Sequence, residues 1–250
     1  MKTLIMLLLA TFLTSSMAQN PETIHFASVD GLELSADIYI TNPDKSTPFI
    51  VLFHQAAWSR GEYLETAPRL NKMGFNVMAV DLRSGGAVNG IENQSHKKAK
   101  EAKLLTTYAH AYPDIGAAVD YARAHYADAQ LIILGSSYSS ALVLRYAGDN
   151  PEAIDGVISF SPGEYFASYG KSDHWIVDAV VNIIVPVFIT SAKNESSNWQ
   201  PFYDAIKSNK VSYLPKTSGN HGSRALWSQF DDSEGYWQAL GKFLDEYFPR

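Results

Sequence analysis

Apolar and polar residues alternate along residues 24–40, on both sides of the dipeptide Asp30-Gly31. Alternation with a period of two is typical of a strand that has one buried face. Asp-Gly between two such runs favours a tight turn. The pattern therefore predicts an antiparallel hairpin near the start of the chain.

After the hairpin, continuous apolar runs alternate with segments of helical periodicity. Continuous runs are typical of strands buried on both faces of a parallel sheet. The predicted strands are 48–54, 75–83, 130–135, 155–161, 186–192 and 211–215. The predicted helices are 61–74, 113–126, 139–148, 202–209 and a long C-terminal segment. This alternation predicts an α/β fold, with a mostly parallel sheet covered by helices on both faces.

Two segments add detail to this picture. In the first predicted helix, Leu64, Ala67 and Leu70 recur at helical spacing, and Gly74 ends the segment. Residues 84–112 are Gly-rich at first and helical later, and they match no element of the repeating pattern. In a parallel sheet such a stretch follows the carboxyl end of a strand, where active-site loops gather.

The first 18 residues have the pattern of a secretory signal peptide. Lys2 is followed by an apolar run from Leu4 to Leu13, which is too short to span a bilayer. Ser16 and Ala18 are small residues at the −3 and −1 positions of a cleavage site. We therefore expect an exported protein, periplasmic or secreted, with a single domain at 19–250 and no stable membrane anchor after cleavage.

Composition excludes several classes of function. The formal net charge is −6, without the basic patch that nucleic-acid binding needs, so we expect no nucleic-acid partner. The chain contains no cysteine, which rules out a thiol nucleophile. No cluster of His or acidic residues has metal-ligand spacing. No Gly-rich loop has the pattern that binds phosphate. We expect neither metal nor cofactor.

The candidate chemistry lies between the predicted strand 130–135 and the helix that follows it. A nucleophile placed there sits on a sharp turn that presses together the residues two before and two after it, so both must be small. Ser137 meets this condition, with Gly135 and Ser139 as its flanks. Ser136 and Ser140 have large flanks, and Ser139 lies one turn too deep. A Ser-rich helix cap is the alternative interpretation.

With this turn the chain resembles the α/β-hydrolase superfamily, most closely its small lidless members related to dienelactone hydrolases. The resemblance covers residues 19–250 and implies the order nucleophile, acid, histidine along the chain. Only His174 and His221 follow Ser137. The resemblance assigns the base to His221, in a Gly-flanked loop before the last helix. His174 lies among polar residues with no strand leading into it, so we expect it on the surface.

The resemblance places the acid after the strand at 186–192, where Glu195 is the only carboxylate. Relatives more often have Asp there. Glu164, after the preceding strand, is the alternative acid. The resemblance also implies an oxyanion hole built from the backbone amides of Ala56 and Tyr138. It casts His54 as a residue that braces its loop, and it favours a structural role for Arg83 over binding of a substrate carboxylate.

These residues together predict ester hydrolysis through Ser137, Glu195 and His221, on a small-molecule or polymer-derived ester. The same residues could serve a thioesterase, a peptidase or a lactonase. A non-catalytic binding protein on a hydrolase scaffold is the alternative from another class. A dienelactone hydrolase proper is disfavoured, because that group typically uses a Cys nucleophile.

Overall fold

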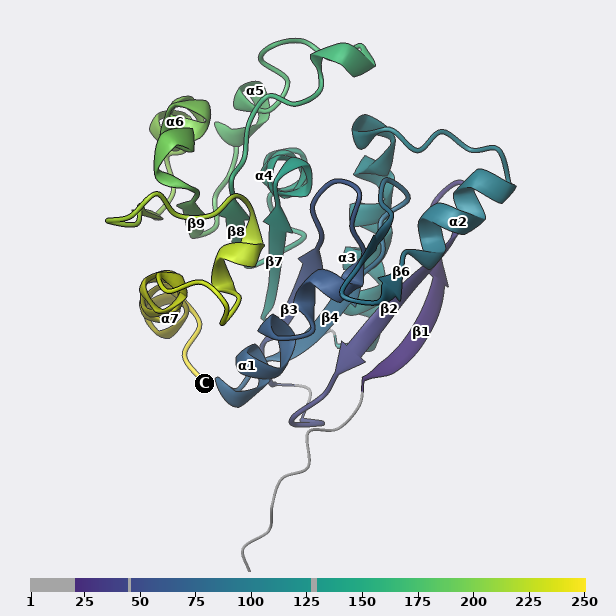
Figure 1. The fold of residues 1–250 in the computed structure, drawn as a ribbon, viewed down its shortest axis with the longest axis horizontal. Helices are drawn as coiled ribbons and strands as arrows, with labels where there is room; N and C mark the ends of the chain where they lie inside the picture. Colours follow the sequence, from purple (N-terminus) through teal and green to yellow (C-terminus); the bar gives the residue numbers. More distant parts are fainter. Residues whose placement is uncertain (1–20, 45, 127–129) are drawn as a thin grey trace, which may run out of the picture.

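A mixed sheet forms the centre of the protein (Figure 1). The computed structural model describes residues 21–44, 46–126 and 130–250, and within these residues eight strands pair in the order β1-β2-β4-β3-β7-β8-β9-β10. Their bounds are β1 (Glu22–Ala27), β2 (Glu33–Tyr39), β3 (Phe49–Phe53), β4 (Asn76–Val80), β7 (Leu131–Ser136), β8 (Gly156–Phe160), β9 (Val187–Thr190) and β10 (Lys210–Tyr213). The predicted signal peptide lies outside the described residues.

The edge formed by β1 and β2 is the predicted hairpin. The two strands pair antiparallel, with Ala27 opposite Glu33, and β2 is antiparallel to β4. All other neighbouring strands of this sheet are parallel. The prediction of a mostly parallel sheet with an antiparallel hairpin at its edge is therefore confirmed.

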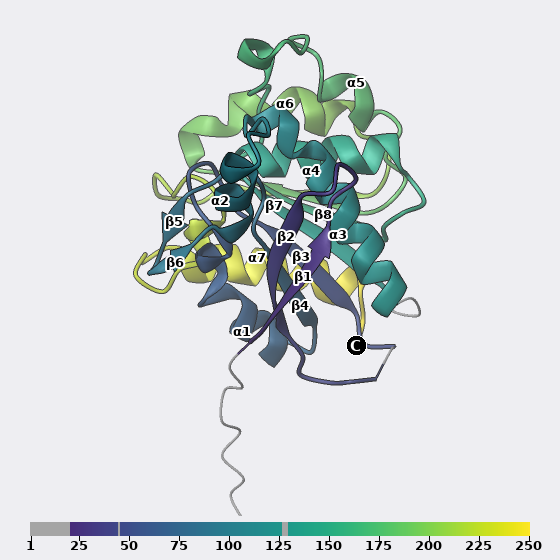
Figure 2. The same ribbon diagram turned by 90° about the vertical axis from the view of Figure 1, so that its right-hand side faces the viewer.

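Helices cover both faces of the sheet (Figures 1 and 2). One face packs against α1 (Thr66–Lys72) and α7 (Ser233–Tyr247). The other packs against α3 (Tyr112–His125), α4 (Tyr138–Asp149), α5 (Val177–Val180) and α6 (Ser196–Ala205). In β3, Ile50 and Leu52 face the first layer while Val51 and Phe53 face the second. A strand buried on both faces must be apolar throughout, as the sequence shows.

Residues 84–112 form a small unit beside the sheet edge. It contains the two-stranded ribbon β5 (Ala87–Val88) and β6 (Ile91–Glu92), then α2 (Gln94–Glu101) and a 3₁₀ turn, η2 (Tyr108–Ala111). The Asn93 side-chain amide donates hydrogen bonds to the carbonyls of Trp58 and Leu82, at 3.1 and 2.9 Å. This unit is thereby fixed to the loops that follow β3 and β4.

The first predicted helix differs from its expected form. A 3₁₀ turn, η1 (Arg60–Tyr63), precedes α1, and Leu64 between them is 38% exposed instead of facing the core. Pro68 has no N–H to donate to a carbonyl one turn earlier, so the α-helix can begin only in the turn that contains it. The side chains of Glu62 and Tyr63 occupy the buried positions instead.

The helix expected at 202–209 also lies elsewhere. It begins at Ser196 and ends at Ala205, because Ile206 is already extended. The Lys210 ammonium donates to the carbonyls of Tyr203 and Ile206, at 2.5 and 2.7 Å. A cation at the last carbonyls of a helix satisfies groups that no further turn can pair, so the helix stops there. Among the described residues, no helix combines the length and apolar character needed to cross a membrane.

Candidate active site

Ser137 lies at the sharp turn between β7 and α4. Its backbone has φ 58° and ψ −121°, a region that residues with a side chain rarely adopt. The Ser137 N–H donates to the carbonyl of Phe160 at 2.8 Å, and the Ser137 carbonyl accepts from Ser140 N at 3.0 Å. These bonds hold the strand-to-helix turn that a nucleophile of this class requires.

The residues on either side of this turn explain its local sequence. A Cβ atom at Gly135 would lie 2.5 Å from the carbonyl oxygen of Ser139, so only glycine fits there. Ser139 stands where Gly is usual, and its hydroxyl donates to the carbonyl of Phe53 at 2.7 Å and accepts from Ser136 N at 2.9 Å. The larger residue is therefore accommodated by hydrogen bonds that join α4 to β3 and β7.

The structure brings Ser137, His221 and Glu195 together from three separate loops. His221 Nε2 lies 2.8 Å from Ser137 Oγ, and His221 Nδ1 lies 2.7 Å from Glu195 Oε1. A carboxylate only accepts, so Nδ1 carries the proton and Nε2 accepts from the serine hydroxyl. Burial raises the pKa of Glu195, but opposing contacts, above all the hydrogen bond donated by His221, outweigh burial and hold the pKa below its usual value.

Glu164, the alternative acid, has a different partner. Its carboxylate accepts from the backbone N–H groups of Ile176 and Val177 at 3.0 Å, just before and at the start of α5. His174 is exposed, as its polar surroundings in the sequence predicted. The geometry therefore favours Glu195 over Glu164 as the partner of the histidine.

The two amides expected to form an oxyanion hole are both free to donate. Tyr138 is the first residue of α4, where a backbone N–H has no partner inside the helix. The Ala56 N–H makes no hydrogen bond to any residue that the structure describes. Ala56 follows β3, so its loop and the Ser137 turn stand at the carboxyl ends of the paired strands β3 and β7.

His54 and Arg83 have structural partners. His54 is fully buried, its Nδ1 lies 2.8 Å from the Gln55 carbonyl, and its Nε2 accepts from Leu82 N at 2.9 Å. Burial lowers the pKa of His54, which favours the neutral ring that these contacts need. The Arg83 guanidinium pairs with Asp114 and Asp30, both at 2.6 Å. Arg83 is thus occupied by the protein itself.

Sequence reasoning missed Glu62, a fully buried acid of η1 beside the site. Glu62 Oε1 accepts from the hydroxyls of Ser136 and Ser223, at 2.7 and 2.5 Å, and Oε2 accepts from Gln55 N at 2.7 Å. Burial raises the pKa of Glu62 to about 7. The signal available in the sequence was helical spacing, because Glu62 precedes the buried Thr66 by four residues and Leu70 by eight.

Several solved structures share the fold of this protein. The chain resembles a dienelactone hydrolase of Anabaena variabilis (TM-score 0.69, 14% identity, 92% of this chain and 99% of the other). It also resembles an esterase of Pyrococcus furiosus (TM-score 0.69, 19% identity, 96% and 97%). A third similar structure is acetyl xylan esterase 1 of a Thermoanaerobacterium species (TM-score 0.64, 15% identity, 92% and 86%). The protein has the α/β-hydrolase fold.

The family follows from the sequence. The family described as serine aminopeptidase, S33, matches residues 44–212, and the chain belongs to it. The search of curated proteins finds no match to the chain. Membership places the protein among serine hydrolases of the esterase and peptidase kind, and the bond that it cleaves has to be inferred from the site.

Proposed function

We propose that the protein is a serine hydrolase that cleaves carboxylic esters through Ser137, His221 and Glu195. The observation that supports this most directly is the continuous chain of hydrogen bonds from Ser137 Oγ through both nitrogens of His221 to Glu195. In this arrangement His221 takes the hydroxyl proton as Ser137 Oγ attacks the acyl carbon. The ionised Glu195 orients the ring and stabilises the positive charge that develops on it.

The rest of the cycle uses the same groups. Attack on the carbonyl places negative charge on its oxygen, and the N–H groups of Ala56 and Tyr138 are the proposed donors to it. His221 then returns the proton to the departing alcohol, which leaves an acyl group on Ser137. Water, activated by His221, attacks this acyl-enzyme, releases the carboxylic acid and restores the serine.

Ester cleavage fits the surroundings of the site better than removal of an N-terminal amino acid. An aminopeptidase must bind a substrate ammonium group, for which a free carboxylate is the natural partner. Here Glu195 pairs with His221, Glu164 bonds the start of α5, and Glu62 is fully buried.

A fluorophosphonate probe tests the proposed function directly, because it reacts with activated serine nucleophiles. We expect the wild-type protein to be labelled, and the Ser137→Ala protein to remain folded and unlabelled. The alternative is a non-catalytic binding protein that has the hydrolase fold. Absence of labelling in a well-folded wild type would support that alternative and overturn the enzyme assignment.

Substrate panels then distinguish among the bonds that this triad can cleave. We expect hydrolysis of 4-nitrophenyl acetate and slower or no cleavage of aminoacyl 4-nitroanilides, which are aminopeptidase substrates. The reverse preference would assign the protein to peptide hydrolysis. Thioesters and lactones belong in the same panel, because all of these acyl compounds pass through similar tetrahedral intermediates.

We also propose that the protein is exported and acts outside the cytoplasm on small-molecule or polymer-derived esters. The support is the pattern of residues 1–18, with Lys2, a short apolar core and small residues before the cleavage position. Mass spectrometry of the protein recovered from its native cells should show a chain that begins near Gln19. An intact N-terminus at Met1 would contradict export by this route.

A further inference from the structure

One buried carboxylate connects three loops of the candidate site. Glu62 accepts from Ser136, which precedes Ser137, and from Ser223, which lies two residues after His221. It also accepts from the backbone of Gln55, which precedes Ala56. Ser223 N in turn donates to Ser136 Oγ at 2.8 Å, so the nucleophile and histidine loops are also bonded to each other. Each loop is thus held within two residues of the group that it supplies.

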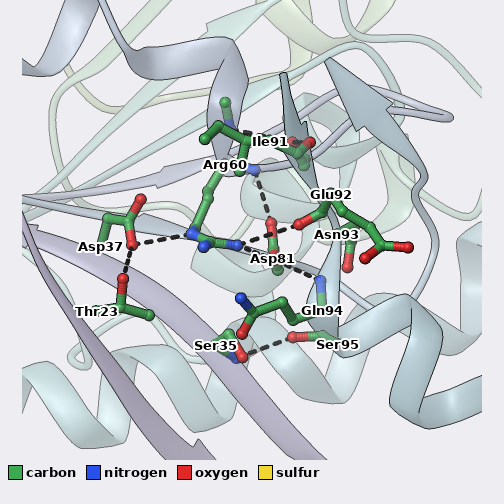
Figure 3. Close-up of polar contacts among 12 residues, drawn as sticks. Thr23, Ser35, Asp37, Arg60, Asp81, Ile91, Glu92, Asn93, Gln94 and Ser95 are labelled. Carbon is green, nitrogen blue, oxygen red and sulfur yellow. Dashed lines mark hydrogen bonds and ion pairs between the residues drawn. The ribbon is translucent and has the colours of Figure 1, made fainter. Parts of the chain in front are cut away.

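The turn that carries Glu62 is itself held rigidly (Figure 3). Arg60, two residues earlier in η1, pairs with Asp81 at 2.6 Å and with Asp37 at 2.9 Å, and all three side chains are buried. Its backbone N–H donates to Asp81 Oδ1 at 2.7 Å. Asp81 follows β4 and Asp37 belongs to β2, so η1 is fixed to the sheet. Through Glu62, the three loops are therefore hydrogen-bonded to a turn that is itself attached to the sheet.

We propose that Glu62 is a positioning residue of the active site, whose ionised carboxylate sets the placement of the nucleophile, the histidine and the oxyanion loop relative to one another. This inference rests on the proposed function. The inference assigns this role to the ionised form, because a protonated acid would have to turn the hydroxyl of Ser136 or Ser223 from a donor into an acceptor and so break the present arrangement. Hydrolysis therefore depends on a deprotonated Glu62.

The environment makes this protonation state sensitive to pH. Desolvation raises the pKa of Glu62 to about 7, while its bonds from Ser223, Ser136 and Gln55 and the nearby His221 oppose that rise. Among the described residues, the other titratable groups that feel its charge are Tyr63 and Tyr138. Burial raises the pKa of both tyrosines far above 10, so both stay neutral. Near neutral pH, the group beside the triad whose charge changes is therefore Glu62.

The test compares Glu62→Gln with the matched control Glu65→Gln. Glu65 is an exposed acid three residues later that also bonds the segment after the histidine loop, through Ser228 N and Oγ. A Gln at position 62 carries an NH₂ group in place of one carboxylate oxygen. That group faces partners that now donate hydrogen bonds to Glu62, so at least one of these bonds is lost. We expect kcat for 4-nitrophenyl acetate to fall by about 10–100-fold, as for small misplacements of reacting groups, with KM little changed. The Glu65→Gln protein should keep wild-type values.

The pH profile separates positioning by charge from simple support. In the wild type, protonation of Glu62 should add one unit to the slope with which log kcat/KM falls on the acid side. Glu62→Gln should reduce that slope by one. Ser223→Ala removes one donor, raises the pKa of Glu62 further and should move the acid limb to higher pH. This second variant keeps the test decisive if Glu62→Gln does not fold.

The pH dependence of thermal stability gives an independent test, because the raised pKa of Glu62 fixes the direction in which stability changes with pH. The pKa of Glu62 is raised above the ordinary value of 4.5, so its contribution to stability is full below that value and is lost as the pH rises through about 7. The melting temperature of Glu62→Gln relative to wild type should therefore increase between pH 6 and pH 8. A difference in melting temperature that does not change between pH 6 and pH 8 would show that Glu62 keeps one charge state across this range, which would contradict the dependence of hydrolysis on its ionisation.

The outcomes are distinguishable from failure of the proposed function. A wild type that resists the fluorophosphonate probe and hydrolyses no acyl substrate overturns both the function and the role of Glu62. A labelled, active wild type with unchanged kcat and an unchanged acid limb in Glu62→Gln overturns only the positioning role. If Glu62→Gln cannot be folded, an acid limb in Ser223→Ala that coincides with wild type has the same consequence.

Discussion

The backbone of Ser137 is strained at the position that the residue occupies. A residue with a side chain at φ 58° and ψ −121° costs on the order of 1–3 kcal/mol, and it persists only where its surroundings fix it. Here the fixing contacts are the bond from Ser137 N to Phe160 and the start of α4. The result is a serine at the end of β7 that is 9% exposed and whose hydroxyl lies within hydrogen-bond distance of His221.

Glu195, the proposed acid of the triad, provides the prediction at the scale of the residue. Glu195→Gln replaces an ionised acceptor with a neutral amide, so the ring of His221 loses both its orientation and the charge that stabilises its protonated form. We expect kcat to fall by about 10²–10⁴-fold, with the fold unchanged by circular dichroism. Initial rates with 4-nitrophenyl acetate provide the measurement.

Glu164→Gln is the control for this substitution. Glu164 bonds the backbone near the start of α5, so its change should reduce stability slightly and leave kcat within about twofold of wild type. If Glu164→Gln lost activity and Glu195→Gln kept it, the assignment of the acid would move to Glu164.

At the scale of elements, β7 and α4 approach each other so closely at Gly135 that no side chain fits between them. Gly135 is the point of contact, because a Cβ there would meet backbone atoms of both Ser139 and Ser140 at 2.5 Å. Backbone atoms of a helix cannot move aside as a flexible side chain can. Glycine at 135 is therefore required by the packing of the strand against the helix, and the sharp turn at Ser137 depends on that packing.

The corresponding prediction contrasts two Gly→Ala substitutions. Gly135→Ala should destabilise the protein by about 2 kcal/mol or more, through overpacking of backbone against backbone. Gly116 lies inside α3, where a Cβ would meet Tyr146 at an ordinary 3.5 Å. Gly116→Ala should therefore stabilise by about 0.5–1 kcal/mol, the usual gain in a helix interior. Urea denaturation measures both, and equal effects would contradict this account.

At the scale of the whole molecule, ion pairs made by two buried arginines join elements that are distant in the sequence. Arg83, after β4, binds Asp30 in the turn of the β1–β2 hairpin and Asp114 in α3. Arg60 similarly joins η1 to β2 and β4. These pairs tie the antiparallel edge of the sheet to the layer of helices that covers it.

Removing one partner of the first cluster tests its contribution. Arg83→Met leaves Asp114 buried without its cation, and we expect a loss of about 3–5 kcal/mol in the free energy of unfolding. Lys98→Met breaks an exposed pair with Glu33 and should cost at most about 1 kcal/mol. A loss for Arg83→Met as small as that for Lys98→Met would show that the buried cluster contributes little.

The elements that the sequence predicts correctly are those with strong local patterns. The hairpin around Asp30-Gly31 and the strands buried on both faces follow from periodicity alone. The boundaries at 61–74 and 202–209 were wrong, because they depend on contacts outside each segment. Lys210 ends α6 from the next strand, and the fully buried Glu62 takes a core position that Leu64 was expected to fill.

For the candidate site, the sequence by itself determined the turn at Ser137, because its constraint is local: small residues must flank a sharp bend between strand and helix. It also limited the base to the histidines after that turn, given the resemblance. Only the tertiary structure decided that Glu195 rather than Glu164 bonds His221. It alone placed Glu62 among Ser136, Ser223 and Gln55, since hydrogen bonds between loops up to 161 residues apart leave no periodic trace in the chain.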